Sequence, residues 1–299
     1  MPHRDLAVFI VLAMPVFLSA CHQPSPHERV GWKAEEFFTD ANAIALCKAI
    51  EAKDLDKIDE LIKDGADVNA KGRGNMTPLL WAFPAGEAVF QRLLEHGADP
   101  NVKVTMRMRP GILPSESVTH LAADVGIALR GTFPDVAMDN YLKLVLEHGG
   151  NPNLETEDGE TPLFRAVQGG GSYVERIQML LKAGVDIDHR DASGTTAAIV
   201  AAGSWHYDGF LILLEAGADY RVINKGGRDV ILVIAKQTEN HPTEKERAVC
   251  SRLEKKGFNL NAARRSVPDL QGAWMIPADQ RPWLNPTKDV GNKPQAQAK

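Results

Sequence analysis

The chain has 299 residues, of which 44% are hydrophobic, so it can bury a sizeable core. Its formal net charge of -5 argues against nonspecific nucleic-acid binding, and it gives no reason to expect attraction to anionic lipid surfaces. We therefore expect no nucleic-acid partner.

The first residues are typical of an exported protein. Met1 to Asp5 is short, and Leu6 to Phe17 is an almost unbroken apolar run that ends in Leu18-Ser19-Ala20-Cys21. A helix of this length is too short to cross a hydrocarbon core of about 30 Å, and Pro15 interrupts it. The pattern predicts a signal peptide over residues 1–20 rather than a transmembrane anchor.

The end of the apolar run resembles a bacterial lipobox, whose cysteine is acylated before cleavage. This resemblance implies that Cys21 is lipidated and that the protein touches the membrane only through its lipid. An ordinary secreted protein with a chance cysteine is the alternative. By resemblance to Gram-negative lipoproteins, His22 favours the outer membrane, facing the periplasm. Residues 21–31, with Pro24 and Pro26, predict a short tether.

A short phrase then recurs along the chain, and Thr-Pro-Leu or Thr-Thr-Ala stretches lie between several of its copies. This spacing predicts one all-α domain over residues 32–265, with about six helix-turn-helix units and hairpin loops. We expect the units at 40–70, 71–102, 103–154, 155–190, 191–222 and 223–263. The copies of the phrase are Gly65-Ala66-Asp67-Val68-Asn69, Gly97-Ala98-Asp99-Pro100-Asn101, Gly149-Gly150-Asn151-Pro152-Asn153, Gly184-Val185-Asp186-Ile187-Asp188 and Gly217-Ala218-Asp219-Tyr220-Arg221.

The last segment, residues 266–299, contains prolines and tryptophans and few helix formers. It predicts an extended latch on the final unit, with a disordered end. Two cysteines remain besides Cys21. Cys47 and Cys250 occupy predicted core positions in the first and last units, so we expect both to be buried and too far apart for a disulfide.

The third unit carries two insertions, at Asn101 to Ser117 and at Asp124 to about Asp139. Insertions in a repeat map to loops on one face, which is often the binding face. Basic and methionine side chains gather at the first insertion and the hairpin before it, whereas the next hairpin is acidic. We interpret these charges as a recognition edge, and mutual surface electrostatics is the alternative. The candidate partner-binding residues here are Arg73, Lys103, Met106, Arg107, Met108, Arg109, Glu157 and Asp158.

Further candidate contacts are His189 and Arg190 at a predicted hairpin tip, and Trp205 and Tyr207 at an inter-helix turn, where core packing is an equal alternative. The remaining conspicuous residues have structural interpretations. We expect His96 and His148 to stabilise helix ends, His120 to bond a neighbouring loop, and Trp81 and Phe83 to lie in the core. The recurring aspartates favour turn formation over calcium binding.

No nucleophile elbow, phosphate loop, zinc motif or dinucleotide fingerprint occurs in the sequence, and its carboxylates are spread over separate units. We therefore expect no catalytic residues, no metal and no cofactor. Together, the repeated phrases and Thr-Pro turns resemble the ankyrin repeat over about Asp40 to Ala263. That resemblance implies a binding protein, expected to be a monomer before it meets a protein partner.

A narrower resemblance joins the lipobox to the repeats. Small bacterial ankyrin lipoproteins of this layout are similar to periplasmic immunity proteins, which neutralise lipase or phospholipase toxins of type VI secretion. The resemblance implies an inhibitor of a secreted enzyme that uses the loop from Lys103 to Ser117 and the concave helices. A non-catalytic scaffold that tethers an endogenous envelope protein is the alternative.

Overall fold

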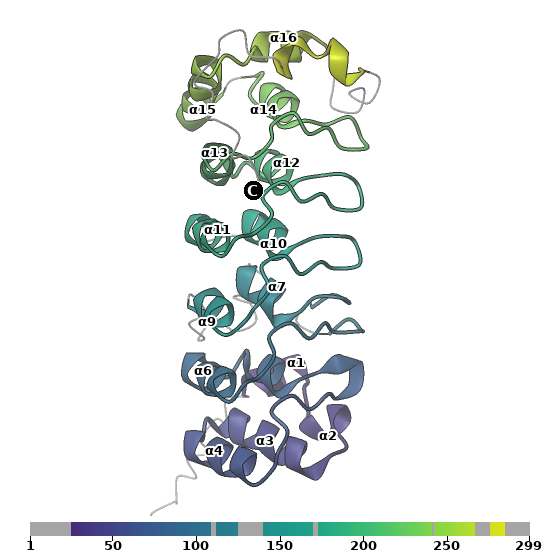
Figure 1. Cartoon of the computed structure of the whole chain (residues 1–299), viewed down its shortest axis with the longest axis vertical. Coiled ribbons are helices and arrows are strands. Elements are labelled where there is room, and N and C mark those ends of the chain that lie inside the picture. The colour runs from purple at the N-terminus through teal and green to yellow at the C-terminus, as the bar shows by residue number, and fades with distance from the viewer. Residues whose placement is uncertain are drawn as a thin grey trace, which may run out of the picture.

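Figure 1 shows the computed structural model of the chain, a tall stack of helix pairs with hairpin loops projecting from one side. The structure describes residues 25–108, 112–124, 140–169, 173–240, 242–266 and 276–284. Within these ranges there is no strand, and the only strand-like pairing is the antiparallel bridge between Met108 and Ile112. The predicted all-α solenoid with hairpin loops is confirmed.

The helices form two columns. Each repeat contributes an inner helix and an outer helix that returns behind it, and from the second repeat on the inner helix follows a hairpin. Neighbouring helices pack along both columns. The inner helices are α3 (Ala41–Ala52), α5 (Pro78–Ala82), α7 (Val118–Ala123), α10 (Pro162–Gln168), α12 (Ala197–Gly203) and α14 (Val230–Gln237). The outer helices are α4 (Leu55–Lys63), α6 (Glu87–Glu95), α9 (Tyr141–Glu147), α11 (Tyr173–Lys182), α13 (Tyr207–Glu215) and α15 (Glu244–Lys255).

The Thr-Pro phrases begin inner helices because threonine and proline suit a helix N-terminus. The Thr77 hydroxyl accepts a hydrogen bond from the Leu80 amide at 3.1 Å, and Pro78 occupies a position whose missing amide proton would have no helical partner. Outer helices end at glycines such as Gly97, whose φ of 83° lies in the left-handed region.

The repeated phrases are tied to one another by their last side chains. The Asn69 amide donates to the Gly97 carbonyl at 3.0 Å and accepts from the Asp99 amide at 2.7 Å. Asn101 and Asn153 make equivalent bridges to the phrases that follow them. The aspartates form turns as predicted: the Asp67 carboxylate, for example, accepts from the Asn69 amide at 2.8 Å.

The histidines and the predicted core residues also take their expected places. His96 lies at the end of α6 and contacts Asp59 at 2.8 Å, and the His148 ring is 2.9 Å from the Leu144 carbonyl. His120 is 3.3 Å from the Glu160 carbonyl of the next hairpin. The side chains of Trp81, Phe83, Cys47 and Cys250 are buried, and the two thiols are free.

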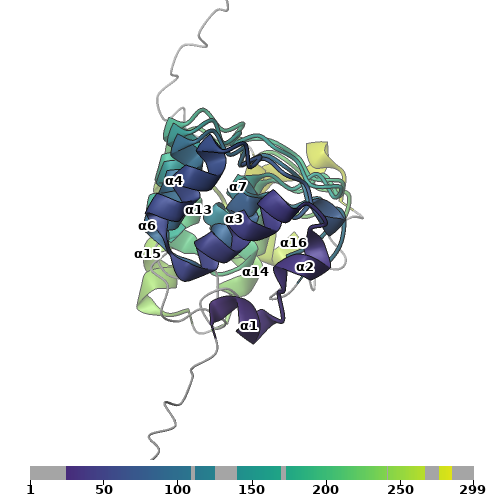
Figure 2. The same ribbon diagram turned by 90° about the horizontal axis from the view of Figure 1, so that it is seen from below.

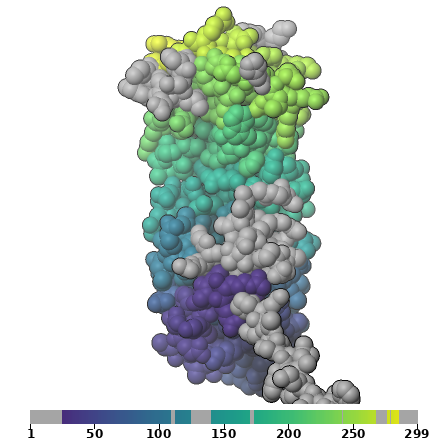
Figure 3. All heavy atoms as spheres, turned by 180° about the vertical axis from the view of Figure 1, so that it is seen from behind, coloured from purple at the N-terminus to yellow at the C-terminus, as the bar shows by residue number. Residues whose placement is uncertain are grey.

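The N-terminal segment differs from the predicted tether. Residues 25–38 fold into α1 (Pro26–Val30) and α2 (Ala34–Phe37), and only residues 21–24 of the tether lie outside the described part of the chain. The imidazole of His27 is buried and stacks on the Trp81 indole, with ring centroids 5.1 Å apart. Because the side chains of His27 and Val30 are buried, this part of the predicted tether belongs to the fold. Figures 2 and 3 show this segment lying against the side of the stack rather than at its end.

The C-terminal segment caps the opposite end. α16 (Leu260–Ser266) packs on α14, and residues 276–284 form the short 3-10 helices η3 (Ala278–Gln280) and η4 (Pro282–Leu284). A latch on the last repeat is confirmed, but it is not extended, because its turns bring Arg281 and Trp283 to Asp229. The predicted disordered end lies outside the described residues. None of the described helices is both long and apolar enough to cross a bilayer.

Candidate functional site

The first insertion of the third repeat forms a long hairpin. The Val104 amide donates to the Glu116 carbonyl at 2.8 Å, and Met108 and Ile112 exchange two backbone hydrogen bonds of 3.0 Å nearer the tip. The hairpin over residues 104–116 is tied to the hairpin before it, because the Thr105 amide donates to the Gly74 carbonyl at 3.0 Å. The insertion is thus held in the same row as the shorter hairpins.

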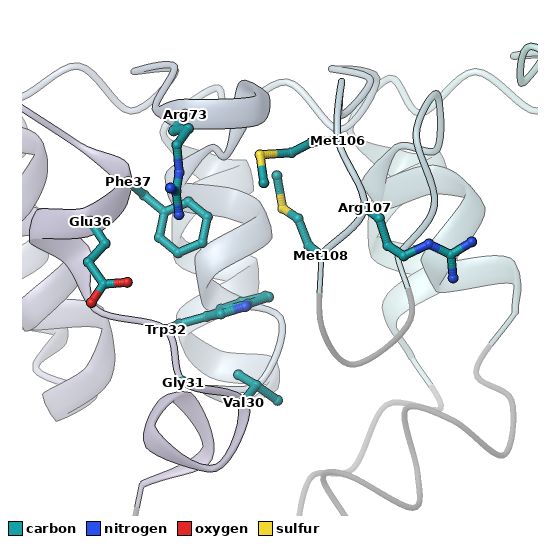
Figure 4. Close-up of a pocket in the computed structure, with 9 residues that line it drawn as sticks. All are labelled: Val30, Gly31, Trp32, Glu36, Phe37, Arg73, Met106, Arg107 and Met108. Carbon is teal, nitrogen blue, oxygen red and sulfur yellow. The ribbon is translucent and has the colours of Figure 1, made fainter.

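A pocket of about 330 Å³ lies between this hairpin and the N-terminal segment (Figure 4). We call it the cap–hairpin pocket. One wall comes from residues 30–37 and the other from the inserted hairpin, with the first hairpin between them. Its lining residues are Val30, Gly31, Trp32, Glu36, Phe37, Arg73, Met106, Arg107 and Met108.

Two glycines in the first hairpin allow both walls to approach it. A Cβ atom on Gly72 would lie 2.7 Å from the Phe37 carbonyl oxygen, and one on Gly74 would lie 2.3 Å from Cγ of Met106. Gly74 also has a φ of 70°, in the region that favours glycine. The pocket therefore depends on two positions without side chains.

The first arm of the inserted hairpin is extended, so its side chains point alternately to opposite sides. Met106 and Met108 extend toward Phe37, whereas Arg107 extends to the other side of the hairpin (Figure 4). The Arg73 guanidinium lies over the Phe37 ring, 5.1 Å from its centroid. Aromatic and thioether side chains form an apolar recess that can adapt to a bulky apolar group, with a cation beside it.

A cluster of charged groups fixes the base of the inserted hairpin. The buried Glu116 carboxylate lies 2.9 Å from the Arg165 guanidinium, which also binds Glu160 at 3.0 Å. Burial raises the pKa of Glu116 above its ordinary value. Burial also lowers the pKa of His120 to about 4 and raises the pKa of Asp124 to about 6. This cluster attaches the hairpin to α10 and lies apart from the cap–hairpin pocket.

The predicted contact residues do not form one patch. Arg73, Met106, Arg107 and Met108 line the cap–hairpin pocket, although Met108 is only 4% exposed and serves as a wall. Arg109 lies outside the described residues. The half-buried Lys103 is outside the pocket, and its carbonyl accepts from the Asn75 amide at 3.0 Å.

The acidic and histidine-containing hairpins lie farther along the stack. Glu157 and Asp158 are exposed, and the Glu157 amide donates to the Ser115 hydroxyl at 2.8 Å. His189 is half-buried and lies 2.8 Å from the Gly159 carbonyl, which gives it a structural role, whereas Arg190 is exposed. The opposite charges are therefore on adjacent hairpins, as the sequence indicates.

The two aromatic residues at the inter-helix turn of the fifth repeat differ in their exposure. Trp205 is 52% exposed, but Tyr207 is 2% exposed and its hydroxyl donates to Gln237 at 3.2 Å. The prediction of Tyr207 as a partner contact is wrong for the folded chain, because α13 turns that ring into the core. Cys21, the predicted lipidation site, lies outside the described residues.

Sequence reasoning missed Val30, Gly31, Trp32, Glu36 and Phe37 as pocket residues. They belong to no repeat, because the first predicted unit begins at residue 40. Within the described ranges, no three histidine, cysteine, aspartate or glutamate side chains are grouped so that they could hold a metal ion. The lining of the cap–hairpin pocket combines apolar side chains with the Arg73 and Arg107 cations and the Glu36 carboxylate.

Comparison with known proteins agrees with this geometry. A family pattern described as ankyrin repeats in three copies matches residues 135–224. The chain is 29% identical over 186 residues to a putative ankyrin repeat protein of fowlpox virus, covering 59% of this chain and 48% of the viral protein.

Two longer proteins share shorter stretches. The mitochondrial disaggregase of Bos taurus is 33% identical over 144 residues, which cover 42% of this chain and 21% of the disaggregase. The human transient receptor potential cation channel subfamily A member 1 is 34% identical over 86 residues, or 29% of this chain and 8% of the channel. The chain thus spans less than half the length of each of these relatives.

Proposed function

We propose that this chain, whose residues 135–224 match the ankyrin-repeat pattern, is a lipid-anchored protein of the bacterial periplasm that binds another protein. Stacked ankyrin repeats present surfaces to protein partners. More specifically, we propose an immunity-type inhibitor that neutralises a secreted enzyme, such as a type VI lipase effector. The enzyme would be held against the inner helices and the inserted hairpin.

The cap–hairpin pocket is the observation that carries this proposal. It is an apolar recess walled by Trp32, Phe37 and Met106, beside the Arg73 guanidinium. Binding energy at protein interfaces concentrates where a few anchor side chains fill such recesses. The inserted hairpin supplies one wall of this pocket, which gives the insertion a role in partner binding.

The proposed anchor supports a partner that works at a membrane. Four residue steps separate Cys21 from Ser25, so the lipidated cysteine would lie at most about 14 Å from the start of α1. Because α1 packs on Trp81 of the second repeat, the tether would hold the side of the stack, and not its end, near the bilayer. An enzyme that attacks lipids could be intercepted there.

The test is affinity capture with the full chain as bait, offering an envelope extract and type VI secreted proteins. We expect recovery of a secreted lipase whose activity falls as the chain is added. The matched variants are Met106→Ala at the pocket and Met179→Ala on the outer helix α11, both at half-buried methionines. Recovery of resident envelope proteins alone would replace the inhibitor with the scaffold. If both variants recovered the same amount of the partner, the cap–hairpin pocket would not be part of the contact with it.

A further inference from the structure

A second hollow lies between the inner helices of the fifth and sixth repeats, which are neighbours in the stack (Figure 1). Its volume is about 330 Å³, and we call it the α12–α14 groove. Val200 and Gly203 line it from α12, Val233 and Gln237 line it from α14, and Arg228 lines it from the sixth hairpin, residues 224–228. The described residues that line this groove and the cap–hairpin pocket are all different.

Short side chains on the two helices leave the space between them unfilled. Four residues after the helix N-cap, α5 has Trp81 and α10 has Arg165. Both of these large side chains are engaged within the chain, Trp81 with the His27 ring and Arg165 with two carboxylates. At the same place α12 has Val200 and α14 has Val233, which line the groove without closing it.

Gly203 leaves one end of the groove open. A Cβ atom at this position would meet nothing within 4 Å, and its φ does not lie in the left-handed region. The equivalent residues, seven places after the N-cap, are Gln168 in α10 and Lys236 in α14. The backbone therefore does not require glycine here, and the missing side chain makes room for a ligand.

The hairpin end of the groove is cationic. The Arg228 side chain is exposed, and no carboxylate of the described residues forms an ion pair with its guanidinium. Residues 190–195 and 224–228 of the two adjacent hairpins carry three exposed cations, Arg190, Lys225 and Arg228, against one carboxylate, Asp191. The Asp191 carboxylate accepts from two backbone amides of its own hairpin at 2.8 Å. An anionic ligand therefore has a free cation to bind.

The rest of the groove is neutral. Its floor is apolar, and the Gln237 amide at the far end donates to the Gly203 carbonyl at 2.9 Å and accepts from the Tyr207 hydroxyl at 3.2 Å. The seven residues of α12 span roughly 10 Å, which is the length of about three residues of extended chain. The groove thus has the length of a short peptide segment and one charged end.

We propose that the α12–α14 groove binds an extended segment of the protein partner that places an apolar side chain next to a carboxylate. The apolar side chain would lie on Val200 and Val233. The carboxylate would pair with Arg228, because a guanidinium can bind a carboxylate through two parallel hydrogen bonds. This inference rests on the proposed protein-binding role, but not on the identity of the partner or on the anchor at Cys21.

The test uses the peptide N-acetyl-Leu-Glu-Leu-amide as the probe. It is titrated into the full chain, and the methyl signals of Val200, Val233 and Met106 are followed by NMR. The control peptides have glutamine or lysine in place of the glutamate. We expect the two valine signals to shift while Met106 in the cap–hairpin pocket stays, and we expect the lysine peptide to bind about tenfold more weakly or less.

Valine signals that do not move at millimolar peptide would overturn the inference. Equal affinity for the glutamate and lysine peptides would overturn it as well, since the carboxylate would then have no role.

Two variants test the residues of the groove. Arg228→Gln should lower the affinity for the glutamate peptide to that for the glutamine peptide, whereas Arg190→Gln, which does not line the groove, should keep it. Gly203→Leu should abolish binding yet melt no lower than wild type, because its side chain meets nothing within 4 Å and leucine favours a helix more than glycine does. Wild-type affinity in either groove variant would contradict the assignment.

The peptide titration is independent of the proposed inhibitor. If the chain bound the glutamate peptide in this groove and left a secreted lipase active, the groove assignment would be supported and only the inhibitor would be contradicted.

Discussion

Asp229 and Arg281 form a buried ion pair, with the carboxylate and guanidinium 2.7 Å apart and the side chains 0% and 1% exposed. Asp229 also caps α14, where its other oxygen accepts from the Leu232 amide at 2.8 Å. In the second and fifth repeats a threonine, Thr77 or Thr196, caps the inner helix. An aspartate has a second oxygen, and here that oxygen accepts from Arg281 and from the indole of Trp283. Where those two repeats have a threonine, the last repeat thus has a residue that also binds the C-terminal latch.

Replacing Arg281 with methionine should destabilise the chain strongly. Arg281→Met would leave Asp229 buried without its cation, for which a loss of about 3–5 kcal/mol in the free energy of unfolding is typical. Urea unfolding measures this loss. The control is Arg190→Met at an exposed hairpin position, where we expect a change within about 0.5 kcal/mol. Equal stability of the two variants would mean that the latch does not hold the last repeat.

Gly74→Ala should damage the cap–hairpin pocket more than its backbone strain explains. Its new Cβ would meet Met106, whereas Gly65→Ala, at a φ of 101°, would meet nothing within 4 Å. Both variants should lose roughly 1 kcal/mol of stability from the left-handed backbone. We expect only Gly74→Ala to weaken binding of the captured partner, measured by calorimetric titration. Matching affinities would show that the partner does not use this pocket.

The stability of the chain should respond to acid through two opposed groups. Burial raises the pKa of Asp124 from 3.8 to about 6, so the folded state takes up a proton there first and stability from this group is lost as the pH rises from 4 to 6. Burial lowers the pKa of His120 from 6.5 to about 4, so the unfolded state takes up a proton first and stability is lost as the pH falls through the same range.

Asp124→Asn removes the group that opposes His120, so the loss of stability caused by His120 at lower pH should become visible. We expect this variant to lose stability more steeply than wild type between pH 6 and pH 4, as followed by urea unfolding at several pH values. Asp158→Asn, at an exposed hairpin position, should keep the wild-type profile. If the profile of Asp124→Asn were as shallow as that of wild type, Asp124 would not be the opposing group.

Two substitutions of Asn153 should remove different numbers of the hydrogen bonds that tie neighbouring repeats together, and should therefore lower the stability by different amounts. Its amide donates to the Gly184 carbonyl at 3.2 Å and accepts from the Asp186 amide at 2.7 Å. Asn153→Asp keeps the accepting oxygen, as Asp188 does naturally toward Asp219 at 2.7 Å, whereas Asn153→Ala removes both bonds. We expect a loss of about 1–2 kcal/mol for alanine and a smaller loss for aspartate. An aspartate variant no more stable than the alanine variant would contradict this account.

The sequence predicts the repeats well because each repeat carries its own local signals. Thr77 and Gly97 mark where helices begin and end, and these signals need no knowledge of distant contacts. The cap–hairpin pocket could not be predicted in the same way, since its Trp32 wall meets the Met106 wall only after the N-terminal segment folds back on the stack.

The direction in which individual side chains point could not be predicted from the local sequence either. In the sequence, Met106, Arg107 and Met108 form one basic and apolar stretch. In the extended arm of the hairpin, successive side chains alternate, so Arg107 points away from the two methionines (Figure 4). Likewise, Trp205 and Tyr207 are two residues apart, but Trp205 precedes α13 and is exposed, whereas Tyr207 is the first residue of that helix and is buried. To predict which of these side chains is exposed, one must know the register of the hairpin or the residue at which the helix begins.

The measurement that tests the central claim most directly is titration of the captured secreted lipase with the chain, following lipid hydrolysis. We predict that the full chain abolishes hydrolysis once it matches the enzyme in amount, that Met179→Ala does the same, and that Met106→Ala needs about tenfold more protein at enzyme concentrations near the dissociation constant. Undiminished hydrolysis in excess wild-type chain would contradict the proposed inhibitor.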